Sequence, residues 1–416
     1  MPVTPGGGGH TFCAIHVGNL PVRSVARHLI AVLLAGAVLW SARTAVPPLV
    51  DAVTGAAPGG DVELVRPLGY VLAAPLSNVL DALTFLSVAR AQALVATWLA
   101  VLAIAGALRR GSRPRRLVRA VLWPLGFVAL AAAAVLLPRP VPRLFLGDPA
   151  AEVIDYHVHT RASHDGRAGW TPARVAWWHA RQGFTATYIT DHNRVFSGSD
   201  DAAIPLLPGV EWSLHQLHLL AIGHVSDFDR ARYSGDVERM MGVFDALHRQ
   251  GALAIGSIPE YWRYHRENLE RFAAGGMDGF EIVNCAPKAI GFDSAARAGV
   301  VRLARQHDLL LVGASDSHGW GMVTCVWNLT VPGARGVQAN RVLARPLALW
   351  QDRGPAWAAG LTQWWWMLRT LSWPERISWL TWIALVTIYR MLPRRDGQAG
   401  GLGILARSLG RSRPTA

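Results

Sequence analysis

The stretch that decides the fold of the central region is Val153-Ile-Asp-Tyr-His157-Val-His159-Thr160. Its apolar run over 153–158 has strand character and ends in two histidines. Side chains two residues apart on a strand point to the same face of the sheet, so both imidazoles can converge on one ion. The stretch therefore predicts a strand that delivers a pair of metal ligands at its end.

Similar apolar runs follow it, and helical patterns separate several of them. The further predicted strands cover 185–189, 206–210, 217–222, 253–255, 280–283 and 309–312. A helix is predicted after Thr171-Pro172, an N-cap followed by proline at the first helical position, and it ends at Gly183. Two more helices are predicted over 236–250 and 293–307. This α/β alternation favours a parallel barrel or a doubly wound sheet, whose sites form at the carboxyl ends of the strands.

Residues of metal-ligand type fall at the ends of these strands. They occur in Ser163-His-Asp165-Gly, Ile189-Thr-Asp191-His192-Asn, Pro208-Gly-Val-Glu211, His218-Leu-Leu and Ser315-Asp316-Ser-His318. An isolated pair of histidines is more often a surface or packing feature, but repeated placement at strand ends in one domain indicates a metal centre. Imidazole and carboxylate ligands suit Zn²⁺, Mn²⁺ or Fe²⁺.

In this order, the segments resemble the motifs of the polymerase and histidinol phosphatase (PHP) superfamily over about residues 151–325. The resemblance implies a distorted seven-stranded β/α barrel, similar to a TIM barrel, with two or three divalent ions and hydrolysis of phosphate esters. It implies a first metal held by His157, His159, Glu211 and Asp316, a second shared by Glu211 and His218, and a third held by Asp165, His192 and His318. The residues that it implies for catalysis are Asp165, His192, Glu211, Asp316 and His318.

One position departs from the family pattern. Where the family usually has Ala-His-Pro after a strand, this chain has Ser257-Ile258-Pro259, and isoleucine cannot bind a metal. Glu260 or His265 could take the place of the missing ligand. The alternative is a two-metal site, or a domain that has lost catalysis.

Other polar residues near these segments have two interpretations each. Arg194 could clamp a phosphate oxygen or be an ordinary surface arginine. Lys288, the only lysine of the chain, is a second candidate for substrate binding. Either His164 or Asp165 could be the ligand from their turn. Asp191 is expected to orient His192 or to cap the turn rather than to bind metal.

The charge of the chain is unevenly distributed. The net charge is +13, yet residues 151–335 contain 17 Lys and Arg against 20 Asp and Glu. The excess of positive charge therefore belongs to the hydrophobic flanks, as the positive-inside rule produces. Nucleic acid is an unlikely partner for so acidic a central region, because binding to its backbone requires clustered Lys and Arg.

The flanks predict an integral membrane protein. We expect a disordered tail over 1–27, a membrane region of three or four hydrophobic helices over 28–140, the PHP-like domain over 150–335, a Trp-rich segment over 340–393 and a basic tail over 394–416. Candidate spans are 29–50, 91–108 and 121–137. The stretch 67–89 could span, re-enter or lie at the interface, and 377–392 could span or lie on the membrane.

The loop over 109–119 contains six arginines and no acidic residue, which predicts a cytoplasmic loop. The next crossing would then place the central domain outside the cytoplasm. The three cysteines are far apart and indicate neither a disulfide framework nor a zinc site.

The sequence thus predicts a membrane-anchored, metal-dependent phosphoesterase that acts on a phosphorylated substrate. The alternative is a degraded PHP-like barrel that serves as a ligand-binding or sensor protein in the membrane.

Overall fold

The structure is a computed structural model that describes residues 22–392 except 149, 201, 227–228 and 332. The predicted basic tail and most of the predicted N-terminal tail lie outside the described residues. The chain divides into two compact units, one formed by Leu39–Trp379 and the other by the segments that precede and follow it. The first unit contains all of the candidate metal ligands.

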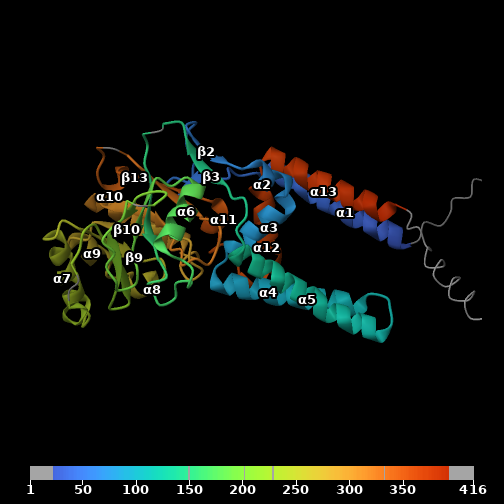
Figure 1. Cartoon of the computed structure of the whole chain (residues 1–416), viewed down its shortest axis with the longest axis horizontal. Helices are drawn as coiled ribbons and strands as arrows, with labels where there is room; N and C mark the ends of the chain where they lie inside the picture. Colours follow the sequence, from blue (N-terminus) through green and yellow to red (C-terminus); the bar gives the residue numbers. More distant parts are fainter. Residues whose placement is uncertain (1–21, 149, 201, 227–228, 332, 393–416) are drawn as a thin grey trace, which may run out of the picture. The chain divides into compact units, whose positions relative to one another are not determined.

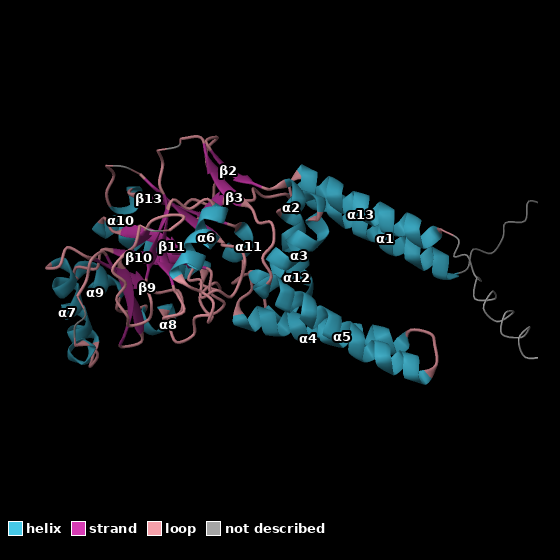
Figure 2. Ribbon diagram, viewed as in Figure 1, coloured by secondary structure: helices cyan, strands magenta, loops and turns pink. Residues whose placement is uncertain are grey.

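The strands of the larger unit form two main sheets, which Figure 2 shows in magenta. The six-stranded sheet has the order β1-β13-β12-β4-β5-β6 and the five-stranded sheet the order β11-β10-β9-β8-β7. The strands of the first sheet are β1 (Val50–Asp51), β4 (Val153–Val158), β5 (Ala186–Ile189), β6 (Leu206–Leu207), β12 (Val326–Thr330) and β13 (Asn340–Ala344). Those of the second are β7 (Gly209–Leu214), β8 (Leu217–Ile222), β9 (Leu253–Ser257), β10 (Gly279–Asn284) and β11 (Leu310–Ala314).

The two sheets meet at two seams. Val158 at the end of β4 forms a parallel bridge with Ser317 just after β11, and His192 after β5 forms one with Glu211 of β7. Each seam is an isolated bridge rather than a ladder, so the described strands do not close into one continuous barrel. The mixed α/β class is confirmed, whereas a closed seven-stranded barrel is not observed. The first bridge joins residues next to candidate ligands, and the second joins two candidate ligands.

The expectation of parallel strands is wrong in part for both sheets, since the first contains antiparallel β12 and β13 and the second contains a reversed strand. Strand β8 runs antiparallel to both β7 and β9, whereas β9, β10 and β11 are parallel. A two-residue turn, His215-Gln216, joins β7 to β8, and both residues have left-handed backbone angles, with φ of 40° and 58°. Such a turn is typical of a tight hairpin. Because β8 is reversed, its first residues lie at the edge where the other strands end.

The three helices predicted in the central region lie close to their predicted positions. Helix α6 (Pro172–Gln182) is capped by Thr171, whose hydroxyl accepts a hydrogen bond from the backbone amide of Arg174. The helix ends at Gly183, which has a φ of +93°. Helix α7 (Val237–His248) is capped by Asp236, and α10 (Ser294–His307) by Asp293. Short helices α8 (Trp262–His265) and α9 (Leu269–Ala274) precede β10.

The sheets also contain strands that the sequence analysis missed. Antiparallel β12 and β13 extend the first sheet beyond residue 335, and β1 adds an edge from the region before residue 150. A separate hairpin pairs β2 (Val62–Val65) with β3 (Arg143–Leu146). The central domain therefore uses chain on both sides of the predicted 150–335.

The undecided stretch 67–89 forms two helices that are too short to cross a bilayer, α2 (Leu68–Leu72) and α3 (Ala74–Thr84). Its polar side chains are buried and paired. Asp81 accepts a hydrogen bond from Tyr70 and forms ion pairs with Arg139 and Arg345 at 3.0 and 2.9 Å. Burial of a charge is tolerated when it is paired in this way.

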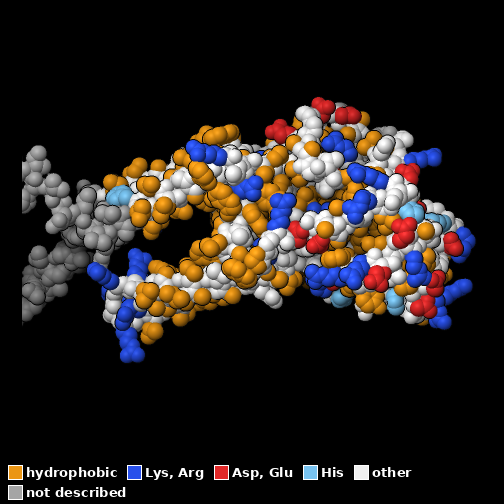
Figure 3. All heavy atoms as spheres, turned by 180° about the vertical axis from the view of Figure 1, so that it is seen from behind, with side chains coloured by type: hydrophobic (Ala, Val, Ile, Leu, Met, Phe, Trp, Pro, Cys, Tyr) orange, Lys and Arg blue, Asp and Glu red, His pale blue; other side chains and the backbone are white. Residues whose placement is uncertain are grey.

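Two helices are long and apolar enough to cross a membrane, α4 (Val88–Leu108) and α5 (Arg113–Leu136). They run side by side away from the sheets, and their connecting loop lies at the far end (Figure 1). A Cβ on Gly106 would lie 2.7 Å from the backbone of Ala120, so the glycine permits this close approach. Hydrophobic side chains cover the hairpin and basic ones gather at its tip (Figure 3).

The remaining helices flank this hairpin in sequence. Helix α12 (Ala359–Arg369) carries the Trp-rich segment and packs against α4. Short α11 (Pro346–Leu349) follows β13. Helices α1 (Val22–Ser41) and α13 (Trp373–Met391) contribute to the smaller unit. A shorter apolar helical stretch, His28–Thr44, runs from α1 into the 3-10 helix Ala42–Thr44.

Candidate metal centre

All eight candidate ligands from the sequence lie together at one edge of the two sheets. Their side chains form overlapping groups that can each hold a metal ion, with ligand atoms within 4.8 Å of one another. These groups are His157/His159/Glu211, His192/Glu211/His218, His159/His192/His318 and His164/Asp165/His192. Asp316 joins the first group, since its Oδ1 lies 3.5 and 3.2 Å from the Nε2 atoms of His157 and His159.

The tautomer of His157 is set by a carboxylate that the sequence analysis missed. Its Nδ1 lies 2.6 Å from Oε1 of Glu281, which is completely buried in β10. Ser257 and Asn284 donate hydrogen bonds to the other oxygen of Glu281. Because Nδ1 must donate to this carboxylate, the lone pair of His157 is on Nε2 and points into the cluster.

The tautomer of His159 follows from a second buried chain of hydrogen bonds. Its Nδ1 lies 2.8 Å from the hydroxyl of Ser163, which also accepts the backbone amide of His192. That hydroxyl donates to Asp191, whose carboxylate can only accept. Nδ1 of His159 must therefore donate, and its Nε2 carries a lone pair. Asp191 thus fixes the turn, accepting from Thr160 as well, rather than binding metal.

Two lone pairs consequently face each other, since the Nε2 atoms of His157 and His159 are 2.9 Å apart. Glu211 and Asp316 surround the same point, and both oxygens of Glu211 and Oδ1 of Asp316 are buried without a well-aligned hydrogen bond. Such an arrangement is repulsive unless a cation lies between the groups. The residues present therefore fit a divalent metal ion.

The electrostatics of the cluster agree with this fit. Burial alone would raise the pKa of Glu211, but His157, His192 and His218 hold it well below its ordinary value. Burial opposes protonation of His157, but Asp316 and Glu211 raise its pKa well above the ordinary value. The field at this point thus favours positive charge, which either a proton or a metal ion supplies.

A second group surrounds the exposed side of the cluster. Oδ1 of Asp165 lies 3.2 Å from Nε2 of His318 and 3.7 Å from Nε2 of His192. Asp165 is about half exposed, and its pKa is below its ordinary value because the two histidines outweigh the effect of burial. His164 is 79% exposed, which makes it the outermost member of the group. Both residues of the turn lie within reach of His192.

The third group is formed by His192, Glu211 and His218. Nδ1 of His192 and Nδ1 of His218 lie 2.6 and 2.8 Å from the two oxygens of Glu211. Ile258, at the position of the family histidine, is completely buried in the apolar core. Of the two possible replacements, His265 directs Nε2 to the backbone carbonyl of His215.

Glu260, the other possible replacement, lies 3.5 Å from the Nζ atom of Lys288. Lys288 is largely exposed and lines a cavity of about 330 Å³ together with Arg263 and the start of α4. Arg194 is exposed at the loop after β5. Neither basic residue has a contact with the cluster among those described, so their roles in substrate binding stay predictions.

The backbone of the ligand loops is held in place by a further missed pair. Asp155, buried in β4, accepts the amides of His157 and Ser315 and lies 2.9 Å from Nε2 of His179. It thereby ties the first ligand strand to the loop that carries Asp316. Asp316 itself has φ of +45°, a conformation that non-glycine residues adopt rarely and that is common at functional sites.

Two of the three cysteines form a pair that their spacing in the sequence did not indicate. Cys285 and Cys325 form a disulfide bond, with a Cα–Cα distance of 5.7 Å. Cys285 follows β10 and Cys325 precedes β12, so the bond ties together two loops at the ligand edge. Their separation of 40 residues hid the pairing from the sequence analysis.

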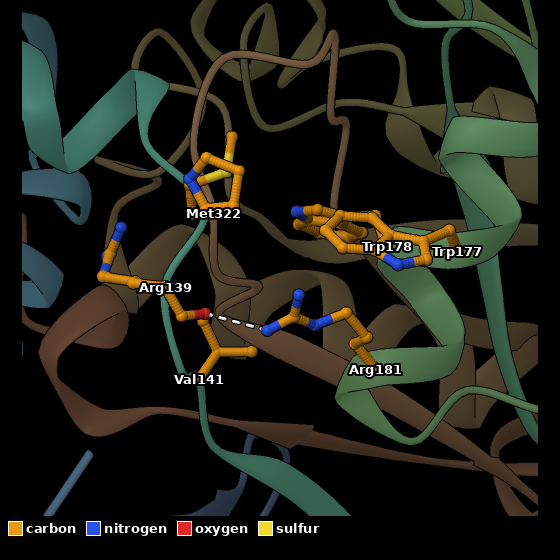
Figure 4. A pocket seen from close by; sticks show the side chains of 7 residues that line it. Arg139, Val141, Trp177, Trp178, Arg181 and Met322 are labelled. Atoms are coloured by element: carbon orange, nitrogen blue, oxygen red, sulfur yellow. Dashed lines mark hydrogen bonds between the residues drawn. The ribbon is translucent and has the colours of Figure 1, made fainter. Parts of the chain in front are cut away.

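A small pocket marks where the chain returns from α5 to the sheets (Figure 4). The segment that follows α5 crosses α6 here, and Arg181 donates a hydrogen bond to the carbonyl of Arg139 at 3.0 Å. Its volume of about 10 Å³ holds no more than a water molecule. The pocket is thus a packing feature between α6 and the segment that follows α5, and not a substrate site.

Comparison with models of known protein families gives no match, and neither does comparison with curated proteins. Among solved structures, the chain is similar to the crystal structure of PsfC from Pseudomonas syringae PB-5123, at 18% sequence identity and a TM-score of 0.34. The similarity covers 48% of this chain and 93% of PsfC. So distant a similarity assigns neither the fold nor the activity of this chain.

Proposed function

We propose that the protein is a membrane-anchored, metal-dependent phosphoesterase of the PHP type, whose two sheets form a distorted barrel. The observation that supports it best is the pair of inward lone pairs on His157 and His159, which face buried carboxylate oxygens of Glu211 and Asp316. Helices α4 and α5 would anchor the domain in the bilayer, with the arginine-rich tip in the cytoplasm.

In the proposed reaction the metal ions and the protein residues have separate roles. Divalent ions bound by these ligands would activate water and stabilise negative charge on the phosphoryl oxygens. Glu281 and the Ser163–Asp191 pair orient the two histidines of β4. The exposed Asp165 and His318 lie at the outer side of the cluster, where they can contact the substrate or accept the proton of the attacking water.

Hydrolysis consumes one water molecule. Its oxygen bonds to phosphorus, the bond from phosphorus to the ester oxygen breaks, and a proton from the water ends on the departing alcohol. No redox partner or further reactant is required. The ligand types are consistent with this reaction, and the acidic central region disfavours a nuclease.

The test uses the full-length protein in detergent. Elemental analysis should detect Zn, Mn or Fe, and panels of phosphomonoesters and phosphodiesters should include a substrate whose turnover requires the metal. We expect His157→Ala and Asp316→Ala each to lower metal content and to reduce turnover by about 10³-fold. The control His224→Ala, at an exposed histidine outside the cluster, should retain both. Turnover that survives both ligand substitutions would refute the proposal.

The buried Ile258 favours a second candidate, a sensor that binds a phosphorylated ligand without hydrolysing it. In a working enzyme with one weakened site, Ile258→His should raise the number of bound ions and the turnover. In a sensor it should leave turnover absent while inorganic phosphate still binds. Isothermal titration together with the phosphate-release assay separates the two.

A further inference from the structure

We infer that the substrate is a phosphorylated membrane lipid, presented to the metal centre from the bilayer surface on which the domain rests. This inference depends on the proposed phosphoesterase function and names its substrate class. It rests on how the ligand loops are attached to the candidate membrane helices.

Two loops at the ligand edge, the one after β11 and the one after β10, are hydrogen-bonded to the ends of these helices. The amide of Gly321, three residues after His318, donates to the carbonyl of Val135 in the last turn of α5 at 3.0 Å. The amide of Val88, the first residue of α4, donates to the carbonyl of Pro287 in the loop after β10 at 3.0 Å. The helix ends are thus attached to two of the loops at the ligand edge.

These attachments limit how far the candidate metal ligands can lie from the ends of the membrane helices. Three residues span at most about 11 Å of extended chain, so His318 lies within that distance of the contact with α5. The head-group layer of one leaflet is itself about 5–8 Å thick. The phosphate of a lipid beside α5 would therefore lie at about the depth of the metal ligands.

The apolar surface of the hairpin reaches its junction with the domain, with the exposed Gln92 as a polar side chain one turn into α4. Val88 at the start of α4 and Leu136 and Leu137 at the end of α5 are 43%, 37% and 59% exposed. If the hairpin spans the bilayer, these side chains require contact with hydrocarbon up to the junction with the domain. The domain would then rest on the membrane rather than stand away from it.

An aromatic and a basic side chain border the exposed side of the cluster. The indole of Trp320 is 54% exposed, and its Nε1 donates to the carbonyl of Asp165 at 3.1 Å. The guanidinium of Arg167 lies over this ring at 5.8 Å, and the amide of Arg167 donates to the carbonyl of His318. Exposed tryptophan is typical of the membrane interface, and arginine binds phosphate.

A soluble phosphate ester would use the same metal chemistry but would gain nothing from the bilayer. The experiment therefore compares each lipid with its head group alone. The full-length protein, in mixed micelles of dodecyl maltoside, is assayed with phosphatidic acid against glycerol 3-phosphate and with phosphatidylglycerol against glycerophosphoglycerol. One lipid should be preferred over its soluble match by at least about tenfold in kcat/KM, and its rate should follow its mole fraction in the micelle.

Trp320→Gln removes the ring but keeps an N–H donor near Asp165. It should lower the ratio of lipid to soluble-ester turnover by about tenfold, mainly through KM at the micelle surface. The control Trp177→Gln removes the ring of another Trp–Arg pair, formed with Arg174 on the surface of α6, and should leave the ratio unchanged.

The outcomes separate the two proposals. If soluble esters are hydrolysed as well as the lipids and Trp320→Gln does not change the ratio, the lipid inference is overturned and the phosphoesterase proposal stands. If the metal-loaded protein hydrolyses no ester of either kind, the phosphoesterase proposal fails and the lipid inference fails with it.

Discussion

At the scale of single residues, the sequence predicted the ligands better than the groups that orient them. His157 and His159 were predictable because alternation along a strand places them on one face. Glu281 was not, since a single glutamate within the apolar run 280–283 gives no sign of which side chain it meets. The hydrogen bond between Asp155 and His179 was not predicted either, because it joins β4 to α6 across 24 residues.

Glu281 offers the sharpest test at this scale. Glu281→Gln preserves the shape of the side chain but removes the negative charge next to Nδ1 of His157, which lowers the basicity of the ligand. We expect metal affinity to fall about 10–100-fold. Competition with a chromogenic chelator measures it. Glu270→Gln, at an exposed pair with His307, is the matched control. Equal affinities in the two variants would contradict the orienting role.

At the scale of secondary-structure elements, local signals were sufficient for helices and insufficient for strand direction. The caps at Thr171, Asp236 and Asp293 are properties of short segments, and the structure confirms them. The reversal of β8 was missed because the His215-Gln216 turn lacks the Asn-Gly or Asp-Gly signature of tight hairpins, and β12 and β13 were missed because they pair with β4 and β1, which are far away in the chain. There was also no sign in the sequence that isolated bridges would join the two sheets.

The α4–α5 hairpin yields a prediction about packing. Gly106→Leu would place side-chain atoms against the backbone of α5 and force the helices apart, and we expect it to cost about 1–3 kcal/mol. Gly126→Leu is the control, because a Cβ at Gly126 meets nothing within 4 Å. Thermal unfolding in detergent, followed by circular dichroism, compares them. Equal losses in both variants would show that the close approach at Gly106 does not matter.

At the scale of the whole molecule, the distribution of charge and hydrophobicity predicted the division into a soluble-like centre and apolar flanks. It did not predict that Asn78 and Asp81 would be buried, because the partners of Asp81 come from distant parts of the chain. It also missed the disulfide bond, which is consistent with a domain outside the cytoplasm.

The disulfide bond can be checked on the purified protein. Alkylation under denaturing conditions without reductant should modify one of the three cysteines, Cys13, and all three after reduction, as mass spectrometry would show. Replacing both Cys285 and Cys325 by serine should lower stability by about 3–4 kcal/mol, since the bond closes a loop of 40 residues. Three reactive thiols in protein isolated from membranes would contradict the pairing.

The relative position of Glu211 and His218 depends on the number of residues in the tight turn between β7 and β8. Ser213 pairs with His218, so Glu211 and His218 lie on one face as diagonal neighbours. A single residue inserted between His215 and Gln216 would turn every side chain of β8 over and direct His218 away from Glu211. Selection on this segment should therefore tolerate exchanges of residue type in the turn far better than insertions or deletions.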